Sequence, residues 1–171
     1  MKTIPLTLSW RDAYKKKVIT PDTLAEQIQA IKSSGKTVAT LNGSFDLLHA
    51  GHLHIIFEAS KVADVLIVLL NTDESIRRYK SADRPIVPLK YRLELIAALE
   101  CIDYVTWFDE TDPRHALSII KPDVHVNGQE YGPDCIERDV VVENGGRLHL
   151  VERIDGLATS QLLKKIKSLC D

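Results

Sequence analysis

The sequence predicts an α/β fold in which five parallel strands form a doubly wound sheet with helices on both faces. Short apolar runs alternate with helical patterns from about residue 20 onward. The run after Asp64 is unbroken through residue 70, as a parallel strand buried on both faces requires. Parallel strands are joined by right-handed helical crossovers, so this alternation indicates one continuous parallel sheet.

Each predicted element follows from its pattern. The strands are expected at residues 37–41, 64–70, 103–108, 123–126 and 147–151. Helical patterns are expected over residues 20–35 and 51–63, from residues 88 and 112, before residue 145 and from residue 159. This succession predicts a Rossmann-like sheet with the strand order 3-2-1-4-5.

Two segments carry more specific expectations. The basic stretch 76–85 reads as a loop. In the last helix, Leu162, Ile166 and Leu169 share one face and are expected to point inward, while the lysines between them point outward.

The length of 171 residues fits one domain with a substantial core. Residues 1–20 show no sustained period and are expected to form an N-terminal extension, with the domain over residues 21–171. The formal net charge of -2 gives no reason to expect a nucleic-acid partner, and no stretch has the apolar length of a membrane span. Three scattered cysteines favour a reducing, cytoplasmic location.

Ligands of doubly wound sheets bind beyond the carboxyl ends of the strands. That rule selects four loops, namely residues 42–52, 71–85, 127–133 and 152–160.

The first loop combines backbone donors with two histidines, His49 and His52, at the start of a helix whose N-terminus favours anions. Imidazoles can donate hydrogen bonds to phosphate oxygens as charge develops in a displacement. The loop therefore predicts a phosphate site. Its expected nucleotide contacts are Gly43, Ser44, Phe45 and Gly51.

Two other interpretations of the histidines are open. They could be ordinary polar residues at a helix start. With His54 they could also bind zinc, but no cysteine or acidic residue follows at a metal-site spacing, so no protein-held metal is expected.

The stretch 43–52, Gly-Ser-Phe-Asp-Leu-Leu-His-Ala-Gly-His, resembles the G-x-F-D-x-x-H-x-G-H signature of the cytidylyltransferase-like nucleotidylyltransferases. The similarity extends from about residue 17 to residue 166. Within this family the chain is most similar to the heptose 1-phosphate adenylyltransferases, through residues 71–78, 84–89 and 156–160.

The resemblance implies that a sugar 1-phosphate attacks the α-phosphate of ATP held with Mg²⁺, and that pyrophosphate leaves. His49 and His52 correspond to the family's catalytic histidines. The family's second motif corresponds to residues 153–160, which assigns Arg153 to catalysis and Thr159 and Ser160 to the β- and γ-phosphates. A homodimer is also consistent with the resemblance.

The chain departs from the family at two places that bear on substrate choice. Ala158 stands where the family has serine, and Asn127 stands where the heptose enzymes commonly have lysine. Asn127 and Gly128 are nevertheless expected to contact the nucleotide. Tyr131 could stack on a base or sugar.

Four further charged residues are candidate substrate contacts, each with a simpler alternative. Lys80 and Arg92 could bind phosphate or could merely be solvated. Asp73 could position substrate or cap a helix, and Asp46 could contact substrate or bond turn amides.

Two other functions fit the same motifs. One is a CTP-dependent transfer to glycerol 3-phosphate or a phospho-amino-alcohol, because small cytidylyltransferases share both motifs. The other is an inactive nucleotide-binding module acting as a sensor or scaffold, which Ala158 and Asn127 would explain.

Overall fold

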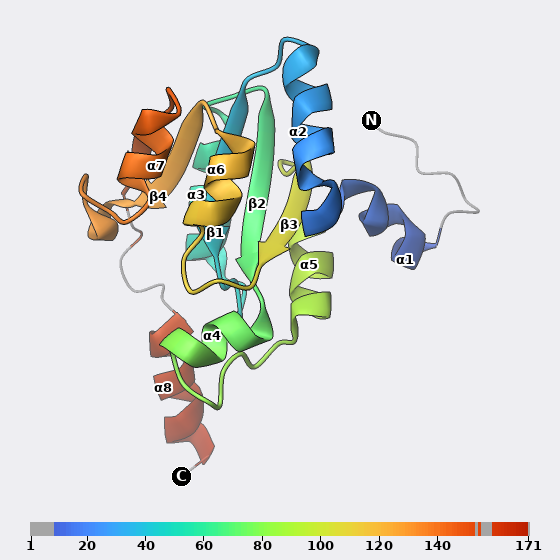
Figure 1. The fold of residues 1–171 in the computed structure, drawn as a ribbon. Coiled ribbons are helices and arrows are strands. Elements are labelled where there is room, and N and C mark those ends of the chain that lie inside the picture. Colours follow the sequence, from blue (N-terminus) through green and yellow to red (C-terminus); the bar gives the residue numbers. More distant parts are fainter. Residues whose placement is uncertain (1–8, 153, 155–158, 171) are drawn as a thin grey trace.

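Five parallel strands form the centre of the molecule in the order β3-β2-β1-β4-β5, as the sequence predicts (Figure 1). The computed structural model describes residues 9–152, 154 and 159–170. The strands are β1 (Val38–Gly43), β2 (Val65–Asn71), β3 (Tyr104–Phe108), β4 (Val124–Gly128) and β5 (Arg147–Val151). β1 is central and pairs with β2 and β4, so the loop that follows β1 leaves from the middle of the sheet.

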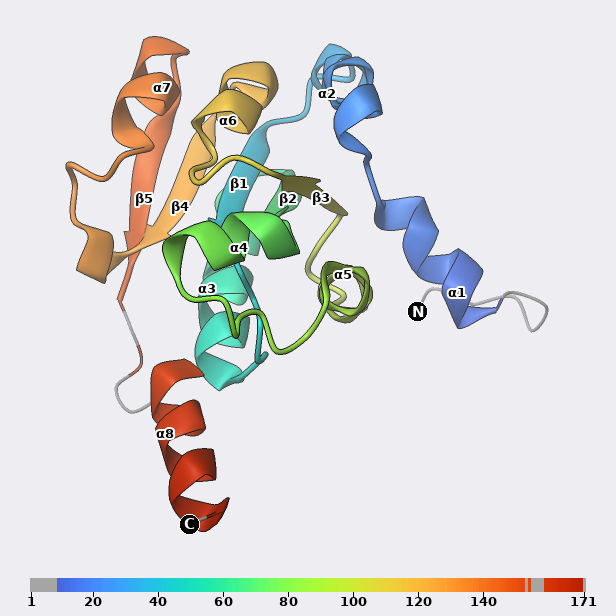
Figure 2. The ribbon, with the colours of Figure 1, turned by 60° about the horizontal axis from the view of Figure 1, so that its bottom comes forward.

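Helices cover both faces of the sheet (Figures 1 and 2). The helices are α1 (Trp10–Ala13), α2 (Leu24–Ser33), α3 (Ala50–Ser60), α4 (Asp73–Tyr79), α5 (Leu89–Ala97), α6 (Arg114–Ile120), α7 (Arg138–Glu143) and α8 (Thr159–Cys170), with 3-10 turns η1 (Tyr14–Lys17), η2 (Pro21–Thr23) and η3 (Gln129–Tyr131). None of these described helices is long and apolar enough to cross a bilayer.

Alternate residues of the strands supply two separate cores. Ala39 and Leu41 of β1 belong to the core beneath α3 and α5, where Ile56 and Ile96 are fully buried. Val38, from the same strand, belongs to the core beneath α2 and α6. This two-sided burial follows from the period of two in a strand and explains why β2 is apolar throughout.

Aspartates placed just before three strands fix where pairing begins. Asp64 Oδ2 accepts a hydrogen bond from Thr37 N at 2.9 Å. Asp103 Oδ2 accepts from Leu66 N at 2.9 Å, and Asp123 Oδ2 accepts from Val38 N at 2.7 Å. Each carboxylate satisfies an amide at the start of a neighbouring strand, where the sheet ladder supplies no partner.

Two predictions about helices are wrong. Residues 76–79 are helical, as part of α4, because Thr72 caps this helix by accepting from Ser75 N at 3.0 Å and Ile76 is fully buried. In α8, two of the three residues predicted to point inward are exposed, Ile166 at 52% and Leu169 at 76%, and Leu162 is half-buried. The helix projects from the body of the molecule, so its apolar stripe has no sheet to cover (Figures 1 and 2).

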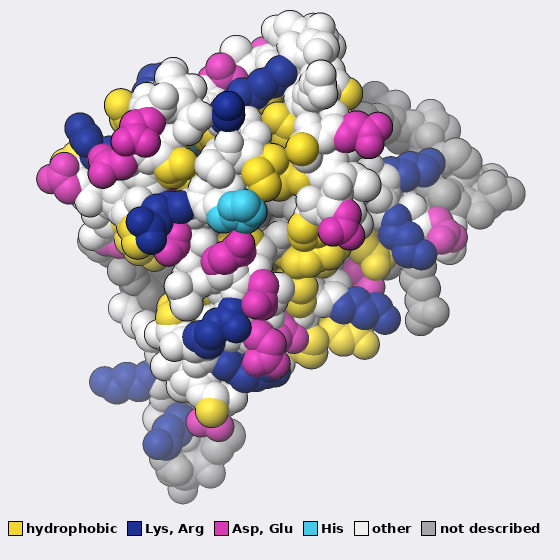
Figure 3. Space-filling view, viewed as in Figure 1, with side chains coloured by type: hydrophobic (Ala, Val, Ile, Leu, Met, Phe, Trp, Pro, Cys, Tyr) yellow, Lys and Arg dark blue, Asp and Glu magenta, His cyan; other side chains and the backbone are white. Residues whose placement is uncertain are grey.

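Basic and acidic side chains are interspersed on the face of the molecule seen in Figure 3.

The expected domain boundary at residue 20 stays a prediction. Val18 forms an isolated parallel bridge with Val105, and Ile19 is buried, so the end of the predicted extension contacts the sheet.

Two isoleucines test the different environments of α5 and α8. Replacing the fully buried Ile96 by alanine should lower the free energy of unfolding by about 2–5 kcal/mol, because it leaves a cavity in the core. The same change at Ile166 should stay within about 0.5 kcal/mol. Urea denaturation of both variants provides the measurement, and equal losses would contradict the placement of α8.

Candidate active site

A cleft of about 440 Å³ opens at the carboxyl ends of the strands. All four loops selected from the sequence contribute to its lining. The predicted site residues that line it are Gly43, Ser44, Phe45, His49, Gly51, His52, Lys80, Asn127, Gly128, Thr159 and Ser160. The fold therefore brings together segments that are more than a hundred residues apart in the sequence.

The two histidines of the first loop are stacked at the start of α3. Their ring centroids are 3.9 Å apart with an interplanar angle of 24°. His49 is the N-cap of α3, and its Nδ1 accepts a hydrogen bond from Gly51 N at 3.1 Å. This bond fixes the ring orientation and, in a neutral imidazole, places the proton on Nε2.

Phe45 supports the pair from below. It is buried, and its backbone has a positive φ of 45°, which is uncommon for a residue with a side chain. Its ring packs edge-on against His52 at a centroid distance of 5.3 Å. A Cβ at Gly43 would lie 3.1 Å from this ring, so the glycine lets the phenylalanine fold back under the loop.

His52 is neutral at physiological pH. Burial, together with the nearby His49 and Lys80, lowers its pKa to about 4. Its Nδ1 is buried and has no hydrogen-bond partner among the described residues. The cleft thus contains a neutral imidazole beside cationic groups.

Two cations line the cleft from the segment after β2. Lys80 Nζ donates to Ser44 Oγ at 2.7 Å, and burial lowers the pKa of this lysine. Arg84 Nε donates to Asp46 Oδ2 at 2.6 Å. Arg84 was not predicted from the sequence. Its signals there were its place in the loop 71–85, beside other basic residues, and in the stretch 84–89 that resembles the heptose enzymes.

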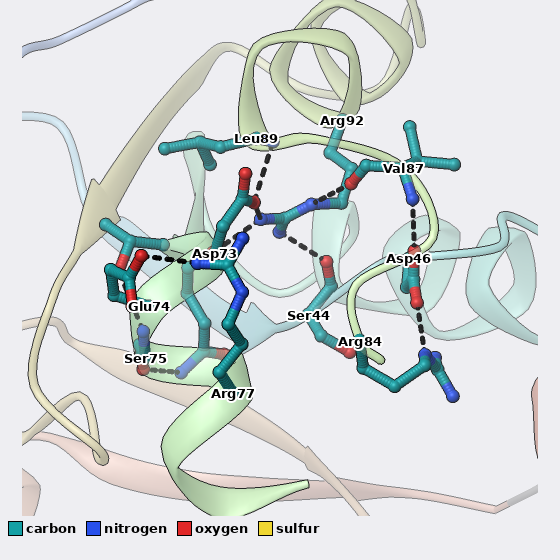
Figure 4. Close-up of polar contacts among 12 residues, drawn as sticks. Ser44, Asp46, Asp73, Glu74, Ser75, Arg77, Arg84, Val87, Leu89 and Arg92 are labelled. Atoms are coloured by element: carbon teal, nitrogen blue, oxygen red, sulfur yellow. Dashed lines mark hydrogen bonds and ion pairs between the residues drawn. The ribbon is translucent and has the colours of Figure 1, made fainter. Parts of the chain in front are cut away.

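Arg92 lies beneath the cleft, fully buried, and does not line it (Figure 4). Its guanidinium donates to three backbone carbonyl oxygens and one carboxylate. The acceptors are Ser44 O at 2.7 Å, Asn71 O at 2.9 Å, Val87 O at 2.8 Å and Asp73 Oδ1 at 2.6 Å. The predicted contact with phosphate is corrected, because these internal bonds occupy the guanidinium.

Asp46 and Asp73 also face the interior instead of the cleft. Asp46 accepts from Arg84 and from the backbone amides of Ile86 and Val87, at 3.0 and 2.8 Å. Burial alone would raise the pKa of Asp46, but these bonds lower it. Asp73 Oδ1 accepts from Leu89 N at 2.8 Å in addition to Arg92. Both aspartates therefore connect loops, which corrects the expectation of direct substrate contact.

The end of β4 forms another wall of the cleft. Asn127 is buried, and its Nδ2 donates to Oε2 of the buried Glu137 at 3.2 Å. A Cβ at Gly128 would lie only 2.2 Å from the Glu130 carboxylate, so Glu130 folds closely over the glycine. Neither glutamate was predicted, because nothing in the sequence indicates that the chain turns back onto the strand here.

Thr159 and Ser160 open α8 and also line the cleft. Arg153 and Ala158 lie outside the described residues. His54 lines the cleft as well, but the described part of the chain contains no group of three or more potential metal ligands.

Comparison with known proteins points to one family. A model described as cytidylyltransferase-like matches residues 40–168. The chain is 43% identical over 148 residues to the bifunctional protein HldE of Citrifermentans bemidjiense, covering 86% of this chain and 30% of that protein. The chain spans about a third of the length of such curated relatives.

Two solved structures share the fold. The lipopolysaccharide core biosynthesis protein from Thermoplasma volcanium superposes with a TM-score of 0.57 at 28% identity, covering 70% of this chain and 98% of that one. A pantoate-beta-alanine ligase from Francisella tularensis gives a TM-score of 0.54 at 14% identity, over 88% and 76% of the two chains.

The buried guanidinium of Arg92 should be essential for stability. Arg92→Met removes the guanidinium donor from three loop carbonyls and leaves the Asp73 carboxylate without its cationic partner, and should lower the free energy of unfolding by about 3–5 kcal/mol. Arg138→Met, at an exposed ion pair on α7, is the matched control and should have a much smaller effect. Denaturation in urea distinguishes them, and a mild effect at Arg92 would refute the network's structural role.

Two histidines should make stability depend on pH. Burial lowers the pKa of His125, like that of His52, to about 4, below the unfolded value of about 6.5. The unfolded chain then binds more protons between pH 4 and 6.5, so stability should fall as the pH falls through this window, by about 3 kcal/mol for His125. NMR titration of the ring protons checks this, and a midpoint near 6.5 at His125 would contradict it.

Proposed function

The chain belongs to the cytidylyltransferase-like family. From this premise we propose that it transfers AMP from ATP to a sugar 1-phosphate, and that this acceptor is a heptose 1-phosphate. The observation that carries the proposal is the stacked His49 and His52 pair at the start of α3, inside a cleft lined by all four loops. The similarity to HldE proteins supports the choice of a heptose acceptor.

The reaction is a displacement at the α-phosphate. An oxygen of the acceptor phosphate forms a bond to the α-phosphorus, the bond to the β-phosphate oxygen breaks, and pyrophosphate leaves with the electron pair. Because His49 Nδ1 accepts from Gly51 N, a neutral His49 carries its proton on Nε2, and we propose that it donates this proton to a non-bridging oxygen. His52, being neutral, can donate in the same way, and no covalent enzyme intermediate is needed.

The leaving phosphates are assigned to the start of α8. Thr159 and Ser160 supply hydroxyl groups there, and the first turn of a helix offers unpaired N–H donors that favour anions. Arg153 is proposed as a cation beside them, by correspondence with the family motif. Asn127 and Gly128 are proposed to contact the base.

Mg²⁺ is expected to enter with the triphosphate. Two carboxylates, Glu130 and Glu152, line the cleft, and Mg²⁺ usually binds substrate phosphates plus one or two carboxylates. These residues fit such an ion, whose charge would offset that of the phosphates.

A homodimer stays a prediction from the resemblance, and a cytoplasmic location stays a prediction from the composition.

Replacing either histidine should remove most of the activity. His49→Ala and His52→Ala are each expected to lower kcat by about 10² to 10⁴, because a donor to the developing charge is lost. His115→Ala, at an exposed histidine on α6, is the matched control and should keep full activity. The assay is pyrophosphate release from ATP or CTP with heptose 1-phosphate, glycerol 3-phosphate and phosphoethanolamine.

The same panel decides between the substrates. Turnover with CTP and a polyol phosphate alone would replace the proposed substrates by those of a cytidylyltransferase. Turnover with no pair, or unchanged turnover in both histidine variants, would reject the proposed chemistry.

A further inference from the structure

We propose that Arg84 binds the phosphate monoester of the acceptor substrate, and that Asp46 positions its guanidinium for this task. The inference rests on the proposed function, because it names the subsite that holds the attacking group. The first observation is that one guanidinium nitrogen of Arg84 lacks a hydrogen-bond acceptor among the described residues.

One nitrogen of Arg84 has no hydrogen-bond partner in the part of the chain that the structure describes. Nη2 is buried, and among the described residues nothing accepts a hydrogen bond from it. The side chain as a whole is 15% exposed and lines the cleft. A buried cationic donor without an acceptor is costly, and an anion supplied by a ligand would satisfy it.

Asp46 determines where this free donor lies. Its Oδ2 accepts from Arg84 Nε at 2.6 Å, and the same carboxylate is held by the amides of Ile86 and Val87. Figure 4 shows the guanidinium meeting Asp46 on one side, with its remaining nitrogens directed away from that carboxylate. The pair therefore fixes the arginine while keeping part of its donor set available.

A second cation lies in the same wall of the cleft. Lys80 also comes from the segment after α4, and its Nζ reaches Ser44 Oγ at 2.7 Å. Ser44 belongs to the histidine loop, and its carbonyl is held by Arg92 at 2.7 Å. Lys80 and Arg84 thus form a cationic wall that is tied to the loop carrying His49 and His52.

The cationic wall and the start of α8 belong to different segments of the chain. The histidine loop follows the central β1, Lys80 and Arg84 follow α4, and Thr159 and Ser160 follow β5. In phosphoryl transfer the attacking and leaving oxygens lie roughly in line on opposite sides of the phosphorus, so the two phosphates need separate subsites. With the leaving phosphates assigned to α8, we assign the attacking phosphate to Arg84, whose Nη2 has no acceptor among the described residues.

Arg84→Gln tests the subsite, with Arg77→Gln as the matched control. Arg77 also follows β2, but it is exposed, its ion pair among the described residues is with Glu74, and it lies outside the cleft lining. Arg84→Gln should raise KM for heptose 1-phosphate about tenfold to a hundredfold, while KM for ATP changes less than about twofold. Arg77→Gln should change neither constant. A rise in KM for ATP alone, or no rise at all, would overturn the proposal.

A binding measurement separates this inference from the proposed function. Calorimetric titration of heptose 1-phosphate into the full chain, saturated with a non-hydrolysable ATP analogue, should show weaker binding to Arg84→Gln than to the wild type. If the wild type binds the probe but releases no pyrophosphate, the proposed function fails and the subsite is judged by this titration alone. Equal affinity of both proteins would refute the subsite.

A second variant, Arg84→Lys, distinguishes a lost phosphate contact from a failure to fold. Arg84→Lys keeps a charge for Asp46 but lacks the second arm of the guanidinium. It should keep the thermal unfolding temperature of the wild type and still bind heptose 1-phosphate more weakly. Wild-type affinity in this folded variant would show that the free nitrogen of Arg84 contributes nothing.

Discussion

The buried guanidinium of Arg92 holds the candidate site together. It donates to carbonyls of the loop after β1, of the end of β2 and of the segment before α5, and it also pairs with Asp73. The first segment follows β1 and the other two lie at and after the end of β2, so the guanidinium joins the chain segments that follow two neighbouring strands. One charged group in the interior therefore sets the distance between the histidine loop and the cationic wall of Lys80 and Arg84.

Electrostatics in the cleft depends on how far each group is removed from water. His52 stays neutral because burial and neighbouring cations oppose a further positive charge, whereas Asp46 stays ionised because three donors outweigh its burial. An incoming phosphate would thus meet the neutral imidazole of His52 and, in the same cleft, the cations Lys80 and Arg84.

Most of the residues that line the cleft were predicted from the sequence, but the charged residues that hold its loops together were not predicted in that role. The residues 43–52 predict a phosphate loop, and the rule for strand ends selected the four loops that line the cleft. Arg92, Asp46 and Asp73 were candidate substrate contacts, each with a simpler alternative. The structure buries Arg92 and Asp46 and half-buries Asp73, since each finds partners supplied by another loop, and partners far apart in sequence leave no local pattern.

The sequence by itself determined the five strands, their order and the reaction class that the histidine loop implies. Those features depend on local periodicity and on a contiguous motif, which one stretch of chain contains in full. Only the tertiary structure decided that α8 exposes its apolar stripe, that Asn127 pairs with Glu137 and that Arg84 keeps a free donor. Each of these depends on which distant atoms are within hydrogen-bonding or packing distance, and that is settled when the chain folds.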